Sequence, residues 1–126
     1  MALILVVDDY PGLQRILSLT LQMHDYLVVT AGNGREALSL LRTEAIDLVI
    51  TDVSIPEMDG LSLLGEIRAD KALSDLPVIV LTAIGQEEVR EAAAQKGASG
   101  FLTKPPSSQE LVEVVSRFLA DEKPAG

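Results

Sequence analysis

Four separated apolar runs in this chain of 126 residues each end at side chains that can bind phosphate or a divalent cation. Continuous apolar runs of roughly four to eight residues are typical of strands buried on both faces of a parallel sheet. The carboxyl ends of such strands lie at the same edge of the sheet, which is where ligands bind. The side chains expected at that edge are those of Asp8, Asp9, Asp52, Thr82 and Lys104.

Three carboxylates, one hydroxyl and one ammonium at one edge favour metal-assisted phosphoryl transfer to an aspartate. A carboxylate such as that of Asp52 can attack a phosphoryl group and form an acyl phosphate. Two unit charges about 4 Å apart repel each other by about 4 kcal/mol at an effective dielectric constant of about 20, so three converging carboxylates need a cation. Mg²⁺ meets that need, since it prefers oxygen ligands, keeps several waters and also binds phosphate. Mn²⁺ is expected to substitute for it.

Each of these residues also has a plain structural interpretation. A single aspartate such as Asp52 usually ends a strand and begins a turn, and Asp8 or Asp9 could cap the helix that follows. Lys104 alone would be an ordinary surface residue. The functional interpretation is favoured because the residues occur together, each at the end of its own apolar run.

Amphipathic helical patterns alternate with the apolar runs, and residues 26–30 form a further run. The sequence therefore predicts a doubly wound α/β fold with a five-stranded parallel sheet. Asn33 with Glu36, and Ser107 with Glu110, have the spacing of capping boxes at helix starts. The first helix is expected from Pro11 through Met23, and Asp59 is expected to cap the third. The residues expected to face the core are Ile16, Leu17, Thr20 and Leu21 of the first helix, Ala37, Leu38, Leu40 and Leu41 of the second, Leu61, Leu63, Leu64 and Ile67 of the third, and Leu111, Val114, Val115, Phe118 and Leu119 of the last.

Residues 87–97 are expected to form the least firmly packed helix. Glu87 and Glu88 favour its start, because acidic groups are stabilised at the positive end of the helix dipole. Gly97 is placed to end it. The segment is rich in Ala and has one large apolar residue, Val89, so it buries little area per turn.

Composition excludes several classes of function. The net charge of −9 opposes direct binding of DNA or RNA, whose phosphates require Lys and Arg. The absence of Cys excludes disulfides and thiolate metal sites. No apolar run reaches the roughly 20 residues of a membrane span, and no secretory signal is recognisable. We therefore expect a cytoplasmic protein without membrane contact, with its sole histidine, His24, on the surface.

The residues at the predicted sheet edge, with the segment Pro56-Glu57-Met58-Asp59-Gly60, resemble the receiver domain of two-component response regulators. The resemblance extends from Leu3 to about Leu119. It implies a receiver domain over residues 1–120, with 121–126 as a tail or the start of a linker. It also implies strand order 2-1-3-4-5 in a flavodoxin-like three-layer sandwich with five helices.

The resemblance implies roles for the residues that handle phosphate. Asp52 is the phosphoacceptor, Lys104 supplies a point charge for a phosphoryl oxygen, and Thr82 donates its hydroxyl to the phosphoryl group. Phe101 stands at the position of a switch aromatic that moves together with Thr82. Pro105 corresponds to a proline that follows a cis peptide bond.

The resemblance also implies a set of ligands for Mg²⁺. Asp9 and Asp52 are expected to bind the ion directly, and Asp8 through a water molecule. The backbone carbonyl of Ser54, two residues after Asp52, completes the set.

The implied function is that of a phosphoacceptor signalling domain, and not of an enzyme beyond its own self-phosphorylation and autodephosphorylation. The expected donor is a sensor histidine kinase or a histidine phosphotransfer protein, which could dock near Tyr10, Gly12 and Leu13. Phosphorylation is expected to switch the surface of the fourth helix, fifth strand and fifth helix for an unknown downstream partner. Ser99 and Gly100 replace the acidic residues of many winged-helix regulators, so a monomer or weak dimer is expected. Without an effector domain in the sequence, a single-domain regulator or an excised receiver is expected.

Three other protein classes fit the sequence less well. Phosphatases of the haloacid dehalogenase type have a D-x-D spacing after the first strand, whereas Asp8 and Asp9 are adjacent and the expected nucleophile follows the third strand. A flavodoxin-like electron carrier would need a Ser/Thr/Gly-rich phosphate loop after the first strand. A dinucleotide-binding fold would need G-x-G-x-x-G at the same place.

Overall fold

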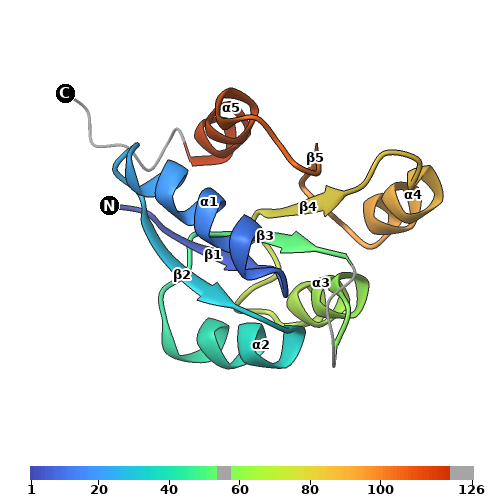
Figure 1. Ribbon diagram of the computed structural model, residues 1–126. Coiled ribbons are helices and arrows are strands. Elements are labelled where there is room, and N and C mark those ends of the chain that lie inside the picture. Colours follow the sequence, from blue (N-terminus) through green and yellow to red (C-terminus); the bar gives the residue numbers. More distant parts are fainter. Residues whose placement is uncertain (54–57, 120–126) are drawn as a thin grey trace.

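The computed structural model describes residues 1–53 and 58–119, which form a five-stranded parallel sheet between two layers of helices (Figure 1). The strands are β1 (Leu3–Val7), β2 (Leu27–Ala31), β3 (Leu48–Asp52), β4 (Val78–Thr82) and β5 (Gly100–Thr103). The helices are α1 (Pro11–Gln22), α2 (Gly34–Thr43), α3 (Gly60–Ala69), α4 (Glu87–Gln95) and α5 (Ser108–Leu119). The strand order β2-β1-β3-β4-β5 confirms the predicted doubly wound fold. The predicted tail, 121–126, lies outside the described residues.

Strand register brings the predicted site residues to one edge of the sheet. β1 and β3 end in register, so Asp8, the first residue after β1, lies beside Asp52, the last residue of β3. β4 and β5 also end in register. Lys104 therefore follows β5 next to Thr82, the last residue of β4, and the Lys104 N–H donates to the Thr82 carbonyl oxygen at 2.8 Å.

The sheet separates two apolar cores, because successive residues of a strand point to opposite faces. Ile4 and Val6 pack with residues of α1 and α5 on one face. Leu5 and Val7 pack with residues of α2, α3 and α4 on the other. Figure 1 shows α2 and α3 on the opposite side of the sheet from α1 and α5. Burial on both faces explains why the strands read as unbroken apolar runs.

Side-chain caps begin three of the helices, as predicted. The Asn33 side chain accepts a hydrogen bond from the Glu36 N–H at 2.7 Å, and the Ser107 hydroxyl accepts one from the Glu110 N–H at 3.1 Å. The Asp59 carboxylate caps α3 with a bond of 2.8 Å. These bonds satisfy N–H groups that have no partner within the helix.

The inward face of α1 differs from the prediction. The prediction was wrong about Ile16, which is 60% exposed, and Thr20 is only half-buried. The residues of α1 that are buried are Leu13, Leu17 and Leu21. The helix has a second apolar stripe that includes Ile16 and Leu19, so periodicity alone does not show which stripe faces the sheet.

The other predicted core faces are confirmed in part. The predicted residues that are buried are Ala37, Leu41, Leu63, Leu64, Ile67, Leu111, Val115 and Leu119. Those that are half-buried are Leu38, Leu40, Leu61, Val114 and Phe118. β2 begins at Leu27, one residue later than predicted, and Tyr26 before it is buried.

Helix α4 buries less of itself than the other helices, as predicted. Its one buried residue is Ala93, and Val89 is half-buried. The helix ends at Gln95, and Gly97, just beyond the cap residue Lys96, has a φ of +99° that suits glycine. The N–H groups of Gly97 and Ala98 donate to the carbonyl oxygens of Ala94 and Ala93 at 3.1 and 3.0 Å, which is a Schellman ending.

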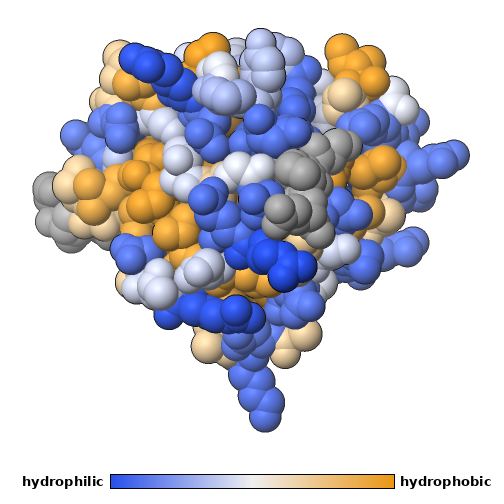
Figure 2. All heavy atoms as spheres, turned by 60° about the horizontal axis from the view of Figure 1, so that its bottom comes forward, coloured by the Kyte–Doolittle hydropathy of each residue, from blue (hydrophilic) through white to orange (hydrophobic). Residues whose placement is uncertain are grey.

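Exposed apolar residues are concentrated around α1. The large apolar side chains that are exposed are Met1, Tyr10, Ile16, Leu19, Met23, Leu27 and Ile84. On the face shown in Figure 2, hydrophobic residues form separate patches among hydrophilic ones. Within the described residues, no helix has the length and apolar character needed to cross a membrane.

Replacing Gly60 with Ala is expected to destabilise the protein by about 1–3 kcal/mol. A Cβ atom at Gly60 would overlap the carbonyl oxygen of Asp52 and would lie 2.8 Å from the Val53 Cα, so α3 would have to move away from β3. Gly65→Ala in the same helix is the matched control, because the nearest atom, Lys96 Nζ, is 3.9 Å away. Urea unfolding of both variants tests this, and equal stabilities would contradict it.

Candidate functional site

The carboxyl edge of the sheet holds three carboxylates in close proximity. One carboxylate oxygen from each of Asp8, Asp9 and Asp52 lies within 4.8 Å of the others. Asp8 is fully buried and Asp52 is 5% exposed, whereas Asp9 is exposed. Thr82, at the end of the neighbouring strand, is also buried. Four of the residues predicted from the sequence therefore meet at one place.

Lys104 contacts two of these carboxylates. Its Nζ donates a hydrogen bond to Asp52 Oδ2 at 2.8 Å and lies 3.5 Å from Asp8 Oδ2. Burial alone would lower the pKa of the Lys104 ammonium, but the hydrogen bond and charge of Asp52, with the charge of Asp8, raise this pKa above its ordinary value. The ammonium therefore stays protonated at neutral pH and offsets part of the repulsion among the acids.

Asp8 is the least satisfied of the three acids. Its Oδ1 accepts a hydrogen bond from the Tyr10 N–H at 2.8 Å, but its buried Oδ2 has no hydrogen-bond partner within the described residues. Burial raises the pKa of the Asp8 carboxyl, and the charge of Asp52 adds to the rise, whereas Tyr10 and Lys104 oppose it. A buried carboxylate oxygen without a hydrogen bond is costly, and this one has only the ion pair with Lys104 at 3.5 Å. This oxygen set fits a hard divalent cation, which would add a second partner.

Backbone contacts hold these side chains in position. The Gln14 side-chain nitrogen donates to the carbonyl oxygens of Asp8 and Ala31, each at 3.1 Å, and so ties the end of β1 to the end of β2. The Thr51 hydroxyl donates to the Asp52 carbonyl oxygen at 2.9 Å. Gln14 was not anticipated, because a polar residue on the first helix carries no sequence signal for such a contact.

The remaining predicted site residues lie around this centre. The Lys104–Pro105 peptide bond is cis. Phe101 is half-buried against the core on the α4 side, and the guanidinium of Arg90 lies 4.8 Å from its ring centroid. The contact with Arg90 was not predicted, because no local pattern indicates which ring a helical arginine will contact. The Ser54 carbonyl lies outside the described residues. His24 is exposed and away from the site, as predicted.

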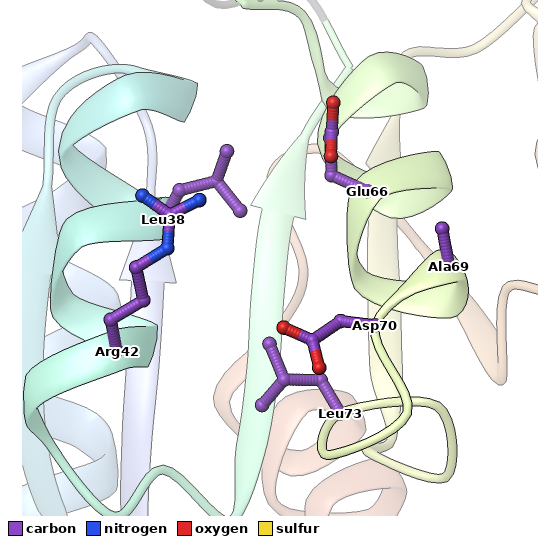
Figure 3. Close-up of a pocket in the computed structure, with 6 residues that line it drawn as sticks. All are labelled: Leu38, Arg42, Glu66, Ala69, Asp70 and Leu73. Atoms are coloured by element: carbon purple, nitrogen blue, oxygen red, sulfur yellow. The ribbon is translucent and has the colours of Figure 1, made fainter.

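Two hollows flank the site. One, of about 440 Å³, is lined by Tyr10, Gly12, Leu13, Ile16, Lys104 and Pro105. The other, of about 190 Å³, lies between the β4–α4 segment and β5, and its lining includes Thr82, Arg90 and Thr103. A third hollow of about 200 Å³ lies between α2 and the α3 region, where Arg42 stands across from Glu66 and Asp70 (Figure 3). It contains none of the residues predicted for the phosphoryl site.

Comparison with known proteins assigns a family to this arrangement. A family model described as the response regulator receiver domain matches residues 4–116. The transcriptional regulatory protein GlrR of Escherichia coli (strain K12) is 44% identical over 122 residues, which cover 97% of this chain and 27% of GlrR. The chain therefore spans about a quarter of the length of this relative.

Solved structures agree with the family match. The chemotaxis response regulator CheY4 of Vibrio cholerae is 34% identical, with a TM-score of 0.89 over 94% of this chain and 99% of that chain. The receiver domain of the sensor histidine kinase PA1611 of Pseudomonas aeruginosa PAO1 is 30% identical, with a TM-score of 0.87 over 94% and 98% of the two chains. That structure has a magnesium ion coordinated in its active site cleft.

Neutralising Asp8 is expected to stabilise the metal-free protein at pH 7. The pKa of its carboxyl is raised in the fold, so the protonated form contributes stability that is present below the ordinary value of 3.8 and is lost as the pH rises through the folded value. Asp8→Asn should therefore gain on the order of 1 kcal/mol at pH 7, and the gain should shrink as the pH falls.

Asp9→Asn is the matched control, because it removes the same charge from an exposed position. Urea unfolding of both variants in EDTA at pH 7 and pH 5 checks this expectation. A larger gain for Asp9→Asn than for Asp8→Asn would show that burial of Asp8 is not the dominant cost.

Proposed function

The chain belongs to the family of response regulator receiver domains, and we propose that its Asp52 accepts a phosphoryl group from a phosphohistidine on a partner protein. The observation that carries the proposal is the convergence of the three carboxylates beside Lys104. An Asp52 oxygen attacks phosphorus, the new P–O bond forms as the P–N bond breaks, and the histidine nitrogen leaves with the electron pair. The donor is a sensor histidine kinase or a histidine phosphotransfer protein.

Mg²⁺ is the proposed cofactor, and Mn²⁺ is expected to substitute. Asp9 and Asp52 would bind the ion directly, Asp8 through water, and the Ser54 carbonyl would be a further ligand. Two observations support this set: Asp8 Oδ2 has no hydrogen bond among the described residues, and one oxygen from each of the three acids lies within 4.8 Å of the others. When bound, the ion would neutralise negative charge on both the carboxylates and the phosphoryl oxygens.

Lys104 and Thr82 would hold the phosphoryl group once it is on Asp52. The Lys104 ammonium already contacts Asp52 Oδ2 at 2.8 Å, so a phosphoryl oxygen attached there falls within its reach. Thr82 ends the strand next to β3, and its hydroxyl would donate to a second phosphoryl oxygen. The domain then catalyses only its own phosphorylation, with the phosphohistidine as donor, and its own dephosphorylation.

The phosphodonor is proposed to dock over the hollow beside Lys104. Tyr10, Gly12, Leu13 and Ile16 line this hollow from the start of α1, and Tyr10 and Ile16 are exposed apolar side chains. Exposed apolar residues next to a reactive group favour contact with another protein. A donor seated there would have its phosphohistidine close to Asp52.

Phosphorylation is proposed to change the surface of α4, β5 and α5, which a downstream partner reads. The movement of Thr82 toward the phosphoryl group vacates space that Phe101 can fill. The shallow burial of α4 supports this location for the change. The partner and any effector domain are not assigned, since the chain spans 27% of the length of GlrR.

Asp52 is expected to become phosphorylated by acetyl phosphate only when Mg²⁺ or Mn²⁺ is present, because the crowded carboxylates need a cation. Intact-protein mass spectrometry should show a mass increase for the wild type that is lost in EDTA and in Asp52→Asn. Equal labelling of the wild type and Asp52→Asn, or undiminished labelling in EDTA, would contradict the site.

Thr82→Ala is expected to accept phosphate but to lose most of the structural response, because its methyl group cannot donate to a phosphoryl oxygen. In the wild type, activation should change hydrogen exchange mainly in residues 83–106 and little in α1 and α2. Hydrogen–deuterium exchange with and without phosphorylation tests this. If Thr82→Ala responded like the wild type, Thr82 would not couple the site to α4 and β5.

A further inference from the structure

Helix α4 is joined to the β5 side of the sheet at two points that differ in kind. Its C-terminal end is held by a network of hydrogen bonds from Arg68 of α3. Its first half touches β5 through the side chains of Arg90 and Phe101. Figure 1 shows α4 at the outer right of the molecule, beyond the ends of β4 and β5.

Arg68 fixes the segment between α4 and β5. Its Nε donates to the Gly97 carbonyl oxygen at 2.9 Å, and its Nη2 donates to the Ser99 hydroxyl at 3.2 Å. The Ser99 hydroxyl also accepts from the Val78 N–H at 3.0 Å. Arg68 Nη1 donates to the Leu76 carbonyl oxygen at 2.7 Å, before β4. Three of these bonds tie the exit of α4 to α3 and to the start of β4, and the fourth ties Arg68 to the segment before β4.

The contact between Arg90 and Phe101 is of a weaker type. The Arg90 guanidinium lies 4.8 Å from the centroid of the Phe101 ring, within the range of a cation–π interaction. Phe101 has no hydroxyl, so this cation takes the place of any hydrogen bond that a tyrosine could make. A stack at a partly exposed site shifts an equilibrium by about two- to fivefold. A contact of this strength can favour one position of α4 over another, and it can still be broken when α4 moves.

Arg90 also lines the hollow of about 190 Å³ that includes Thr82 and Thr103. The Arg90 guanidinium thus stacks on the Phe101 ring, and Arg90 shares a hollow with Thr82. A rearrangement of Thr82 or Phe101 would change what Arg90 contacts. The Arg68 bonds at Gly97 and Ser99 involve none of these groups.

We propose that the Arg90–Phe101 stack is the releasable contact that holds α4 in its unphosphorylated position, and that α4 pivots about the end held by Arg68. The proposal rests on the proposed function, since a phosphoryl group on Asp52 supplies the trigger. Arg90 is a positioning residue that acts through Phe101. A contact present in only one of two states shifts their balance by its own interaction energy. Loss of the stack therefore favours the activated state.

The first test is a double-mutant cycle in the unphosphorylated protein. Arg90→Met keeps a long apolar stem without the cation, and Phe101→Leu keeps an apolar side chain without the ring. Urea unfolding of the wild type, both single variants and the double variant should give a coupling of about two- to fivefold in the unfolding equilibrium constant. If the changes in the free energy of unfolding caused by the two single substitutions simply added in the double variant, the proposed interaction between Arg90 and Phe101 would be disproved.

The second test uses beryllofluoride with Mg²⁺ as a probe of the phosphorylated state. Arg90→Met should reach half-saturation at about two- to fivefold lower beryllofluoride concentration than the wild type. Arg42→Met removes the same charge from α2, which packs against β1, β2 and α3 and lies away from β5 (Figure 1), and it should leave the midpoint unchanged. Equal midpoints for Arg90→Met and the wild type would overturn the release step.

Hydrogen exchange locates the pivot. On beryllofluoride binding, amides of residues 83–92 should change more than those of 97–99, which the Arg68 network holds. Equal changes in both segments would overturn the pivot. If neither the wild type nor any variant bound beryllofluoride, both the proposed function and the proposed release of α4 would be disproved. If the effects of the two substitutions on unfolding were additive but beryllofluoride bound normally, only the role of the Arg90–Phe101 contact would be disproved, and the proposed function would stand.

Discussion

Repulsion among carboxylates at the carboxyl edge of the sheet is the constraint around which this protein is arranged. The register of β1 with β3 brings the ends of the two strands together and so places Asp8 beside Asp52. Lys104 offsets part of the repulsion, with contacts of 2.8 and 3.5 Å to the two acids. Asp8 Oδ2 is still left without a hydrogen bond among the described residues. The three carboxylates could hold a divalent cation, and such an ion would relieve the repulsion that the fold creates.

The parts of the structure that could be predicted from the sequence are those with local signals. Unbroken apolar runs identified the strands, and the spacing of Asn33 with Glu36 identified a helix start. The inward face of α1 could not be predicted, because Leu13 and Ile16 belong to two stripes that are both apolar. Which of the adjacent Asp8 and Asp9 is buried depends on tertiary packing, and composition cannot distinguish them.

Contacts between residues far apart in the sequence were beyond prediction for a different reason. Arg68 lies 29 residues from Gly97 and 31 from Ser99, and a guanidinium on a helix gives no sign of which carbonyl it will meet. Gly60 looked like an ordinary helix start, yet its missing Cβ allows α3 to approach the backbone of Asp52. Such positions become visible only when the packing of separate elements is known.

The strong charge of the domain limits how a signal can travel from Asp52. A phosphoryl group adds close to two negative charges to an edge that is already acidic, in a chain of net charge −9. Lys104, with a cation on the three acids, would neutralise much of that charge, and salt screens the remainder beyond roughly 8 Å. The electrostatic effect of the phosphoryl group on distant elements would therefore be weak. In the proposed switch, the signal would instead pass through short contacts, such as those of a hydroxyl that turns and a ring that repacks. α4 is suited to respond to such contacts, because its single buried residue is a small alanine. A small change in the side chains packed against α4 can therefore move the helix.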